Sequence, residues 1–277
     1  MKQIYSHLLA LDLDGTLLTS DKKLTDRTVC ALKNAIAAGS VVVLATGRPF
    51  TGIPDELRDF PGVRYAITSN GAVTTDLATD EMLRRKCICR DAALEISNRM
   101  KLDNRMHVVF MDGMGYCEEE DFSRLIGQYS GTPIEAYIRK SRRVIAYLSD
   151  RISKSNGVEN IWILCADKSD RKNLRQEIEL TWHLQTVACG SVDLEIGHPD
   201  SDKGRALVDL AVYLNIPRVR IIAIGDDEND LGMLEVAGIS VAMGNAGEKL
   251  AGVASFVTDS NDEDGAAKAI EIILMEL

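Results

Sequence analysis

Two aspartates separated by one residue, Asp12 and Asp14, follow the short apolar run Leu8–Leu11 near the start of the chain. Such a run predicts a buried strand, and side chains two positions apart along a strand point the same way. Both carboxylates are therefore expected to face one spot, and Gly15 allows a sharp turn behind them. Because crowded carboxylates repel each other unless a cation lies between them, the pair indicates a divalent metal. Taken alone, the pair is also compatible with an ordinary polar strand end.

A second acidic group follows the apolar run Val219–Ile224. The loop after it contains four aspartate or asparagine residues: Asp226, Asp227, Asn229 and Asp230. As a plain loop this would be a costly concentration of negative charge. Carboxylate oxygens are the ligands that Mg²⁺ prefers, so we interpret the loop as part of a metal site.

A third predicted strand, Val41–Leu44, is followed by Thr46, Gly47 and Arg48. In a doubly wound sheet, ligands lie beyond the carboxyl ends of the strands, where Thr46 would meet the two aspartates. The Thr46 hydroxyl and the N–H of Gly47 can hydrogen-bond phosphate oxygens. Without the other motifs, this segment would be a common turn.

Two further polar positions are weaker signals on their own. Asn70 precedes Gly71 just past the predicted strand Tyr65–Ile67, and Asn-Gly pairs are frequent in turns. Lys203 precedes a predicted helix, where a positive charge opposes the helix dipole. That placement makes sense if Lys203 faces an anion or the acidic cluster, and a solvated surface lysine is the alternative.

Together these groups would converge at one end of one sheet. A nucleophilic carboxylate, a metal that neutralises charge and hydrogen-bond donors for phosphoryl oxygens are what phosphoryl transfer requires.

Both ends of the chain alternate short apolar runs with amphipathic helices. The helices are expected at Thr25–Ala38 and Arg205–Leu214, and a further strand is expected at Ile239–Ala242. Alternation of this kind predicts an α/β fold with a doubly wound, Rossmann-like parallel sheet.

The middle of the chain is richer in Arg, Lys and Glu, and its strands are less uniformly apolar. We therefore predict an inserted α+β cap domain at 86–190, between the 1–85 and 191–277 parts of the sheet domain. Its expected strands and helix are His107–Met111, Val144–Leu148, Ile161–Cys165 and Lys168–Leu180.

Composition limits the partners and the compartment. The 277 residues carry a formal net charge of −10, which argues against nucleic acid or an anionic membrane as the main partner. No tight CxxC pair is present and the first residues contain no long apolar segment, so we expect reduced thiols and a cytoplasmic location. The cysteines are Cys30, Cys87, Cys89, Cys117, Cys165 and Cys189.

At the level of whole motifs, the chain resembles the phosphatases of the haloacid dehalogenase superfamily, and among them the Cof-like subgroup with a large type IIB cap. The segments that carry the resemblance are Asp12–Thr16, Ala45–Arg48, Ser69–Ala72, Lys203–Gly204, Gly225–Asp230, Ala242–Ala246 and Asn261–Gly265. They cover nearly the whole sheet domain. One departure lies before Lys203, where relatives more often have serine, and we expect the nearby His198 to be a turn residue.

The resemblance implies roles for the two aspartates of the first strand. Asp12 would attack phosphorus and become an aspartyl phosphate. Asp14 would protonate the leaving oxygen and then deprotonate the water that hydrolyses the intermediate.

The resemblance also implies a ligand set. Mg²⁺ would be bound by the Asp12 carboxylate, the Asp14 backbone carbonyl and Asp226, with support from Asp227 and Asp230. The phosphoryl oxygens would be held by Thr46, Gly47, Lys203 and Asn229. Arg48 and Asn70 would contact the leaving group or the cap.

The predicted function is Mg²⁺-dependent hydrolysis of small phosphorylated metabolites, with sugar phosphates as the expected substrates, by a monomer or homodimer. The cap would exclude water and select the leaving group. A phosphomutase with the same covalent intermediate is the nearer alternative. A receiver-type phospho-acceptor domain is more distant, because it needs neither the acid/base Asp14 nor an inserted domain.

Overall fold

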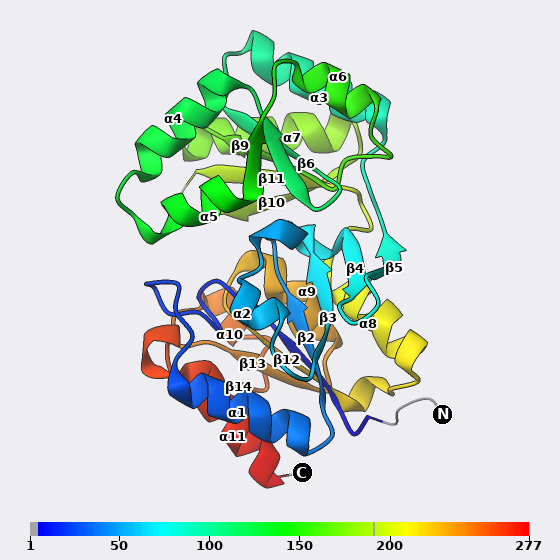
Figure 1. Cartoon of the computed structure of the whole chain (residues 1–277), viewed down its shortest axis with the longest axis vertical. Helices are drawn as coiled ribbons and strands as arrows, with labels where there is room; N and C mark the ends of the chain where they lie inside the picture. The colour runs from blue at the N-terminus through cyan, green and yellow to red at the C-terminus, as the bar shows by residue number, and fades with distance from the viewer. Residues whose placement is uncertain (1–4, 191, 277) are drawn as a thin grey trace. The chain divides into compact units, whose positions relative to one another are not determined.

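The computed structural model describes residues 5–190 and 192–276, which divide into two compact units (Figure 1). Three chain segments form the first unit and two form the second. The first comprises Met1–Gly47, Pro54–Arg84 and Asp202–Leu277, and the second comprises Arg48–Ile53 and Arg85–Ser201.

The first unit is built on an eight-stranded sheet in which β1 (Leu8–Leu11) lies between β12 and β2. Its strands are, in spatial order, β14 (Phe256–Val257), β13 (Ile239–Ala242), β12 (Ile221–Gly225), β1, β2 (Val41–Ala45), β3 (Val63–Thr68), β4 (Val73–Asp76) and β5 (Glu81–Arg85). The pairs from β14 to β3 are parallel, and β4 returns antiparallel to β3 through the left-handed residues Ser69 and Asn70. This chain order places the switch in winding direction beside β1, where α/β sheets bind ligands.

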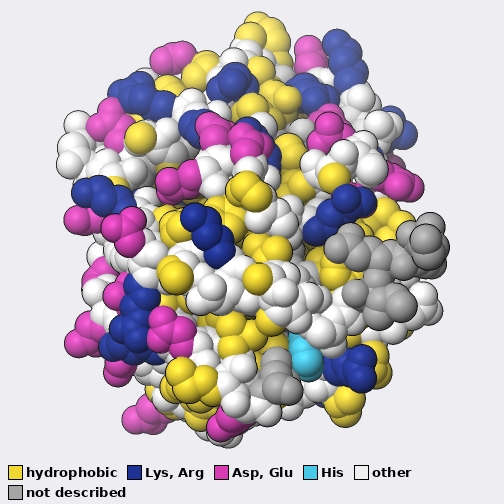
Figure 2. Space-filling view, turned by 60° about the horizontal axis from the view of Figure 1, so that its bottom comes forward, with side chains coloured by type: hydrophobic (Ala, Val, Ile, Leu, Met, Phe, Trp, Pro, Cys, Tyr) yellow, Lys and Arg dark blue, Asp and Glu magenta, His cyan; other side chains and the backbone are white. Residues whose placement is uncertain are grey.

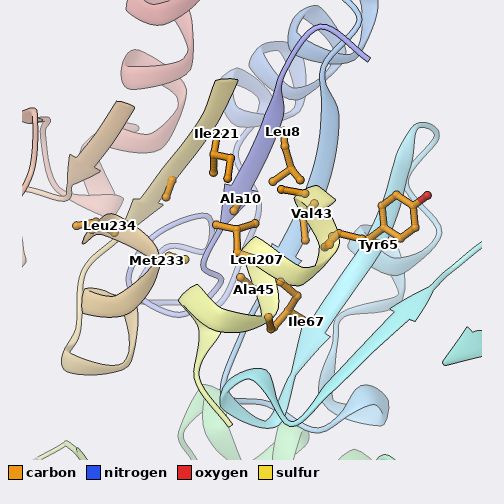
Figure 3. Packing of buried hydrophobic residues seen from close by; sticks show 14 of the residues in the cluster. Leu8, Ala10, Val43, Ala45, Tyr65, Ile67, Leu207, Ile221, Met233 and Leu234 are labelled. Carbon is orange, nitrogen blue, oxygen red and sulfur yellow. The ribbon is translucent and has the colours of Figure 1, made fainter. Parts of the chain in front are cut away.

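Helices cover both faces of this sheet, which confirms the doubly wound α/β prediction. In Figure 1, α1 (Asp26–Ala37) and α11 (Gly265–Glu276) lie side by side. On the opposite face, Figure 3 shows Leu8, Ala10 and Val43 packed towards Leu207 of α8 (Lys203–Leu214). The remaining helices of the unit are α2 (Asp55–Arg58), α9 (Leu231–Val236) and α10 (Glu248–Ala251).

The start of α8 differs from the predicted start at Arg205. The side chain of Asp202 accepts a hydrogen bond from the Arg205 N–H, so Asp202 is the N-cap and the helix begins at Lys203. Because Asp202 is the N-cap, Lys203 lies in the first turn of α8, and its side chain is fully buried.

The second unit has a six-stranded sheet with apolar clusters on both faces. Helices α3, α6 and α7 cover one face, and α4 and α5 cover part of the other. The strand order is β10 (Gln185–Cys189), β11 (Asp193–Gly197), β9 (Asn160–Leu164), β6 (His107–Met111), β7 (Met114–Cys117) and β8 (Arg142–Val144). The helices are α3 (Arg90–Leu102), α4 (Glu119–Tyr129), α5 (Pro133–Ser141), α6 (Leu148–Ser153) and α7 (Lys168–Thr181).

Two boundary predictions need correction. The core does not resume at residue 191, because β11 pairs with β9 and β10 and so belongs to the second unit up to Ser201. The predicted strand Val144–Leu148 is also wrong. The strand β8 ends at Val144, and Leu148 begins α6, whose apolar side chains pack into the second unit.

Charges of both signs are mixed on the molecular face shown in Figure 2, with no large basic patch in that view. In the part of the chain that the structure describes, no helix is both long and apolar enough to cross a membrane. The five cysteines whose side chains are described are all free thiols.

Candidate active site

The register of three parallel strands brings the predicted motifs together. Leu11 at the end of β1 is paired with Leu44 of β2 on one side and with Ile224 of β12 on the other. Asp12 is the first residue after β1, and Thr46 is the first residue after β2. Both still bond to the neighbouring strand: the Asp12 N–H donates to Ile224 O at 3.1 Å, and the Thr46 N–H donates to Ile67 O at 2.8 Å. The sheet therefore presents Asp12, Thr46 and the acidic loop at one edge.

Lys203 lies between two of the acids. Its Nζ is 2.7 Å from Asp12 Oδ1 and 2.7 Å from Asp230 Oδ1, and none of its surface is exposed. Burial alone would lower the pKa of Lys203, but the adjacent carboxylates outweigh it and raise that pKa above its ordinary value. Lys203 is therefore a fixed ammonium group at the start of α8.

Burial acts on the acids in the opposite sense. Desolvation raises the pKa of Asp12 well above its ordinary value, and the negative charges of Asp230 and Asp226 add to this, while Lys203 opposes it. Desolvation and Asp230 likewise raise the pKa of Asp226 to about 7. A site with these pKa values binds protons readily when no other cation is present.

The acidic loop after β12 is folded around Asp230. Its second oxygen, Oδ2, accepts hydrogen bonds from the N–H groups of Asp226 (2.9 Å) and Asp227 (3.2 Å). A Cβ at Gly225 would lie 2.5 Å from Asp230 Cγ, so only glycine allows this approach. The Asp227 side chain is exposed and accepts a hydrogen bond from the Glu228 N–H.

Three carboxylates are close enough to share one cation. Single oxygens of Asp12, Asp226 and Asp230 lie within 4.8 Å of one another. Against these three carboxylates stands the one ammonium group of Lys203, so the buried cluster has an excess of negative charge when all are ionised. The all-oxygen donor set and this charge imbalance fit Mg²⁺. Asp230 Oδ1 binds the Lys203 ammonium group and its Oδ2 accepts two backbone N–H groups of its own loop, so Asp230 is already committed to holding the cluster together.

Three of the predicted phosphate-site residues also lie together. The Asn229 amide donates to Asn70 Oδ1 at 3.0 Å, and Gly47 sits against both, since a Cβ there would be 2.9 Å from Asn70 Oδ1. Asn70 has a left-handed backbone (φ 54°) and its N–H donates to Thr46 O. The turn predicted at Asn70 is thus present, and it also places the Asn70 amide beside Gly47 and Asn229.

Asp14 lies past the end of the first strand, so strand alternation alone does not determine where its carboxylate faces. The strand ends at Leu11, and the chain beyond it turns, with Leu17 N–H donating to Asp12 O. The alternation that applies along a strand therefore does not reach Asp14. Its half-exposed carboxylate instead forms an ion pair with Lys22, at 2.7 Å from Nζ to Oδ1.

Arg48 and His198 belong to the second unit rather than to the cluster. The guanidinium of Arg48 is 4.5 Å from the centroid of the Tyr137 ring and donates to Gly52 O. His198 accepts a hydrogen bond from the Asp200 N–H through Nδ1, which is a loop contact of the kind expected.

Comparison with known proteins identifies the family. The model for haloacid dehalogenase-like hydrolases matches residues 9–270, nearly the whole chain. The chain belongs to this family. It is 32% identical to the 5-amino-6-(5-phospho-D-ribitylamino)uracil phosphatase YwtE of Bacillus subtilis strain 168 over 284 residues, which cover 96% of this chain and 97% of the relative.

Solved structures of haloacid dehalogenase-like hydrolases share the fold. One from B. subtilis superposes with a TM-score of 0.83 at 28% identity and covers 96% of this chain and 99% of its own. The subclass IIB sugar phosphatase BT4131 has the same fold, with a TM-score of 0.80 at 21% identity, covering 96% of this chain and 98% of its own. Family membership confirms the Cof-like phosphatase prediction and sets aside the non-enzymatic receiver alternative.

Within this haloacid dehalogenase-like site, sequence reasoning left three residues without a role. Thr16 Oγ1 donates to Asp226 Oδ1 at 2.9 Å, and Asn245 Nδ2 donates to Gly15 O at 2.9 Å and to Asp226 Oδ2 at 3.2 Å. Thr16 and Asn245 both lie in segments that carried the family resemblance, and that membership was the available signal. The third residue is Lys22, whose pairing with Asp14 no motif indicates.

Gly15 offers a test of how tightly this site is built. Its backbone is left-handed (φ 82°), and an added Cβ would lie 2.2 Å from Asp226 Oδ2. We expect Gly15→Ala to lower the melting temperature and to abolish phosphatase activity because Asp226 must move. In Gly131→Ala, the matched control, the backbone is also left-handed (φ 74°) but no atom lies within 4 Å of the added Cβ. That control should lower the free energy of unfolding only by the cost of placing a Cβ on a left-handed backbone, about 1–2 kcal/mol, and should retain activity. Equal effects of the two variants would contradict this account.

The raised pKa of Asp226 predicts how stability depends on pH without metal. The unfolded chain loses this proton near the ordinary value of 3.8, whereas the folded protein keeps it up to about pH 7. Stability therefore falls as pH rises through this window, because the folded state binds more protons there. In EDTA, melting temperatures measured from pH 4.5 to pH 8 should fall less steeply for Asp226→Asn than for the parent. Asp227→Asn, which removes an exposed carboxylate of the same loop, should keep the parent slope.

Proposed function

We propose that this chain is a Mg²⁺-dependent phosphatase that hydrolyses phosphomonoesters of small metabolites through an aspartyl phosphate on Asp12. The observation that carries the proposal is the buried Asp12 carboxylate, bound to Lys203 and close to Asp226 at the sheet edge. A carboxylate held beside a fixed ammonium group can approach an anionic phosphoryl group without facing uncompensated repulsion.

Asp12 and Asp226 would hold the metal with the Asp14 backbone carbonyl, the ligand set that the family resemblance implies. Bound Mg²⁺ would neutralise negative charge on the phosphoryl oxygens and on the two carboxylates. Asp230 would support the site without binding the metal itself, because its two oxygens hold Lys203 and the N–H groups of the loop. Asp227, which is exposed and caps Glu228, would contribute only its charge.

In the first step an Asp12 oxygen forms a bond to phosphorus while the bond from phosphorus to the leaving oxygen breaks. Asp14 donates its proton to that leaving oxygen, so the product leaves as an alcohol. In the second step Asp14 takes a proton from water, whose oxygen attacks phosphorus and displaces the Asp12 carboxylate. The products are inorganic phosphate and the restored enzyme.

Four residues would hold the phosphoryl oxygens. Thr46 and Gly47 at the end of β2 offer a hydroxyl and a backbone N–H, Lys203 offers an ammonium group, and Asn229 offers an amide beside Asn70. Their placement by strand ends and a helix start fixes them before substrate arrives, which reduces the reorganisation needed in the transition state.

We propose that the substrates are sugar or polyol phosphates, selected by the second unit acting as a cap. This is supported by the similarity to YwtE, which is named for a phosphoribitylamino substrate, and by the shared fold with a sugar phosphatase. The segment Arg48–Ile53 leaves the phosphate-binding strand and groups with the second unit. Arg48, the first residue of that segment, is the residue we assign to the leaving group. The cytoplasmic location and the monomeric or homodimeric state stay predictions from sequence.

Asp12→Asn is the direct test of the mechanism. The amide lacks the nucleophilic charge, so we expect phosphate release from p-nitrophenyl phosphate and from a panel of sugar phosphates to fall by about 10³-fold or more. Asp227→Asn, the exposed control in the acidic loop, should retain most of the activity. Brief reaction with radiolabelled substrate followed by acid quench should label the parent protein and not Asp12→Asn.

Full turnover by Asp12→Asn would remove this residue from its role. Transfer of the phosphoryl group to an added sugar, in place of phosphate release, would favour the phosphomutase alternative.

Metal removal is an independent test. EDTA should abolish phosphate release and Mg²⁺ should restore it. Because a ligand that binds only the folded state raises its stability, Mg²⁺ should also raise the melting temperature of the parent. Asp226→Asn should lose most of that shift, whereas Asp227→Asn should keep it. Activity that is indifferent to chelation would contradict the metal assignment.

A further inference from the structure

The loop that follows the two aspartates carries a lysine that the proposed mechanism does not use. Lys22 Nζ lies 2.7 Å from Asp14 Oδ1, in a charge-assisted hydrogen bond. About two-fifths of the Asp14 side chain is exposed (39%), so packing alone does not fix the carboxylate. A proton donor must nevertheless be held close to its productive geometry to be effective.

The backbone of this loop is held in a conformation that a lysine rarely adopts. Lys22 has a left-handed φ of 61°, which costs a residue with a Cβ about 1–2 kcal/mol. Hydrogen bonds within the loop oppose that cost, from Lys22 N–H to Thr19 O (2.8 Å) and from Thr19 N–H to Lys23 O (3.0 Å). The conformation directs the Lys22 side chain back to Asp14.

Residues from the far end of the chain anchor the same loop. Asp262 accepts two hydrogen bonds from Ser20, one from its N–H and one from its hydroxyl, both at 2.7 Å. The Asn261 amide donates to Leu18 O at 2.9 Å. Asn261 and Asp262 belong to the segment Asn261–Gly265, which carried the family resemblance but received no role in the chemistry.

This anchor is continuous with the metal side of the site. The Asn261 N–H donates to Asn245 Oδ1 at 3.0 Å, and the Asn245 amide contacts Asp226 Oδ2 at 3.2 Å. One hydrogen-bonded chain therefore runs from Asp226 to the loop that carries Lys22. The loop is placed by the same residues that place the acidic cluster.

From this arrangement we propose that Lys22 is a positioning residue for Asp14, held in place by Asn261 and Asp262. Its ammonium binds Asp14 Oδ1 and restricts the rotation of the carboxylate that exchanges a proton with the leaving oxygen. Lys22 thus acts on the substrate only through Asp14. This inference rests on the proposed phosphatase mechanism and extends it to a residue outside the predicted site.

Such a role predicts a loss that depends on the leaving group. A sugar alkoxide is a poor leaving group and needs the Asp14 proton, whereas p-nitrophenolate leaves readily without it. We expect Lys22→Met to lower kcat/KM for a hexose 6-phosphate by about 10-fold or more, and to change that for p-nitrophenyl phosphate by no more than about 2-fold. Lys22→Arg, which keeps the charge, should recover part of the loss.

Three controls separate positioning from a general structural effect. Lys23→Met alters the exposed neighbouring lysine and should behave as the parent with both substrates. In an Asp14→Asn background, Lys22→Met should have no further effect, because the residue it acts through is gone. Asp262→Ala, which loosens the loop without touching Lys22 or Asp14, should reproduce the leaving-group-dependent loss in weaker form.

Equal losses on both substrates, no loss, or a gain with the hexose phosphate would overturn the proposal. The same would follow if Lys22→Met and Asp14→Asn had fully additive effects. Failure of the proposed function is a different result: the parent protein itself would release no phosphate from either substrate in the presence of Mg²⁺.

Discussion

The burial of Lys203 between Asp12 and Asp230 is the interaction on which the rest of the site depends. A buried ammonium group is tolerated only when carboxylates accompany it, and removing one partner of such a pair costs about 3–5 kcal/mol. Here the three groups come from the end of β1, the start of α8 and the loop after β12. The ion pairs therefore hold three distant chain segments in one geometry, and the same contacts act on the pKa of Asp12.

The negative charge that remains after this pairing determines which ions the cluster attracts. Three carboxylates share one ammonium group, so the cluster attracts protons, as the raised pKa values of Asp12 and Asp226 indicate. The same excess favours a divalent cation, and in the proposed mechanism a phosphoryl group would then meet a site whose positive and negative groups are close to balance. A protein with a net charge of −10 would thereby bind an anionic substrate through local charge.

The sequence was sufficient to predict the residues at the strand ends, because parallel strands in a doubly wound sheet must finish at one edge. Asp12, Thr46 and Asp226 follow from that rule. The rule does not extend to the Asp14 carboxylate, since Asp14 lies past the last strand residue, where the alternation of side chains no longer applies. Lys22 could not be predicted either, because its contact depends on a left-handed backbone and on anchors from the opposite end of the chain.

The predicted domain boundary at residue 191 was wrong for a related reason. Asp193–Gly197 form an ordinary strand, and only the pairing of this strand with β9 and β10 shows which sheet it joins. Sequence periodicity identifies a strand but carries no information about its partner.

The contacts between segments far apart in the sequence bear on when the site can assemble during synthesis. Ser20 and Thr25 are bound by Asp262 and Asp264, and Arg27 of α1 is paired with Glu271 of α11. Asp12 is translated well before α11, so the loop beside Asp12 acquires these partners only once α11 has been synthesised. A nascent chain therefore carries Asp12 long before it carries the contacts that order the neighbouring loop.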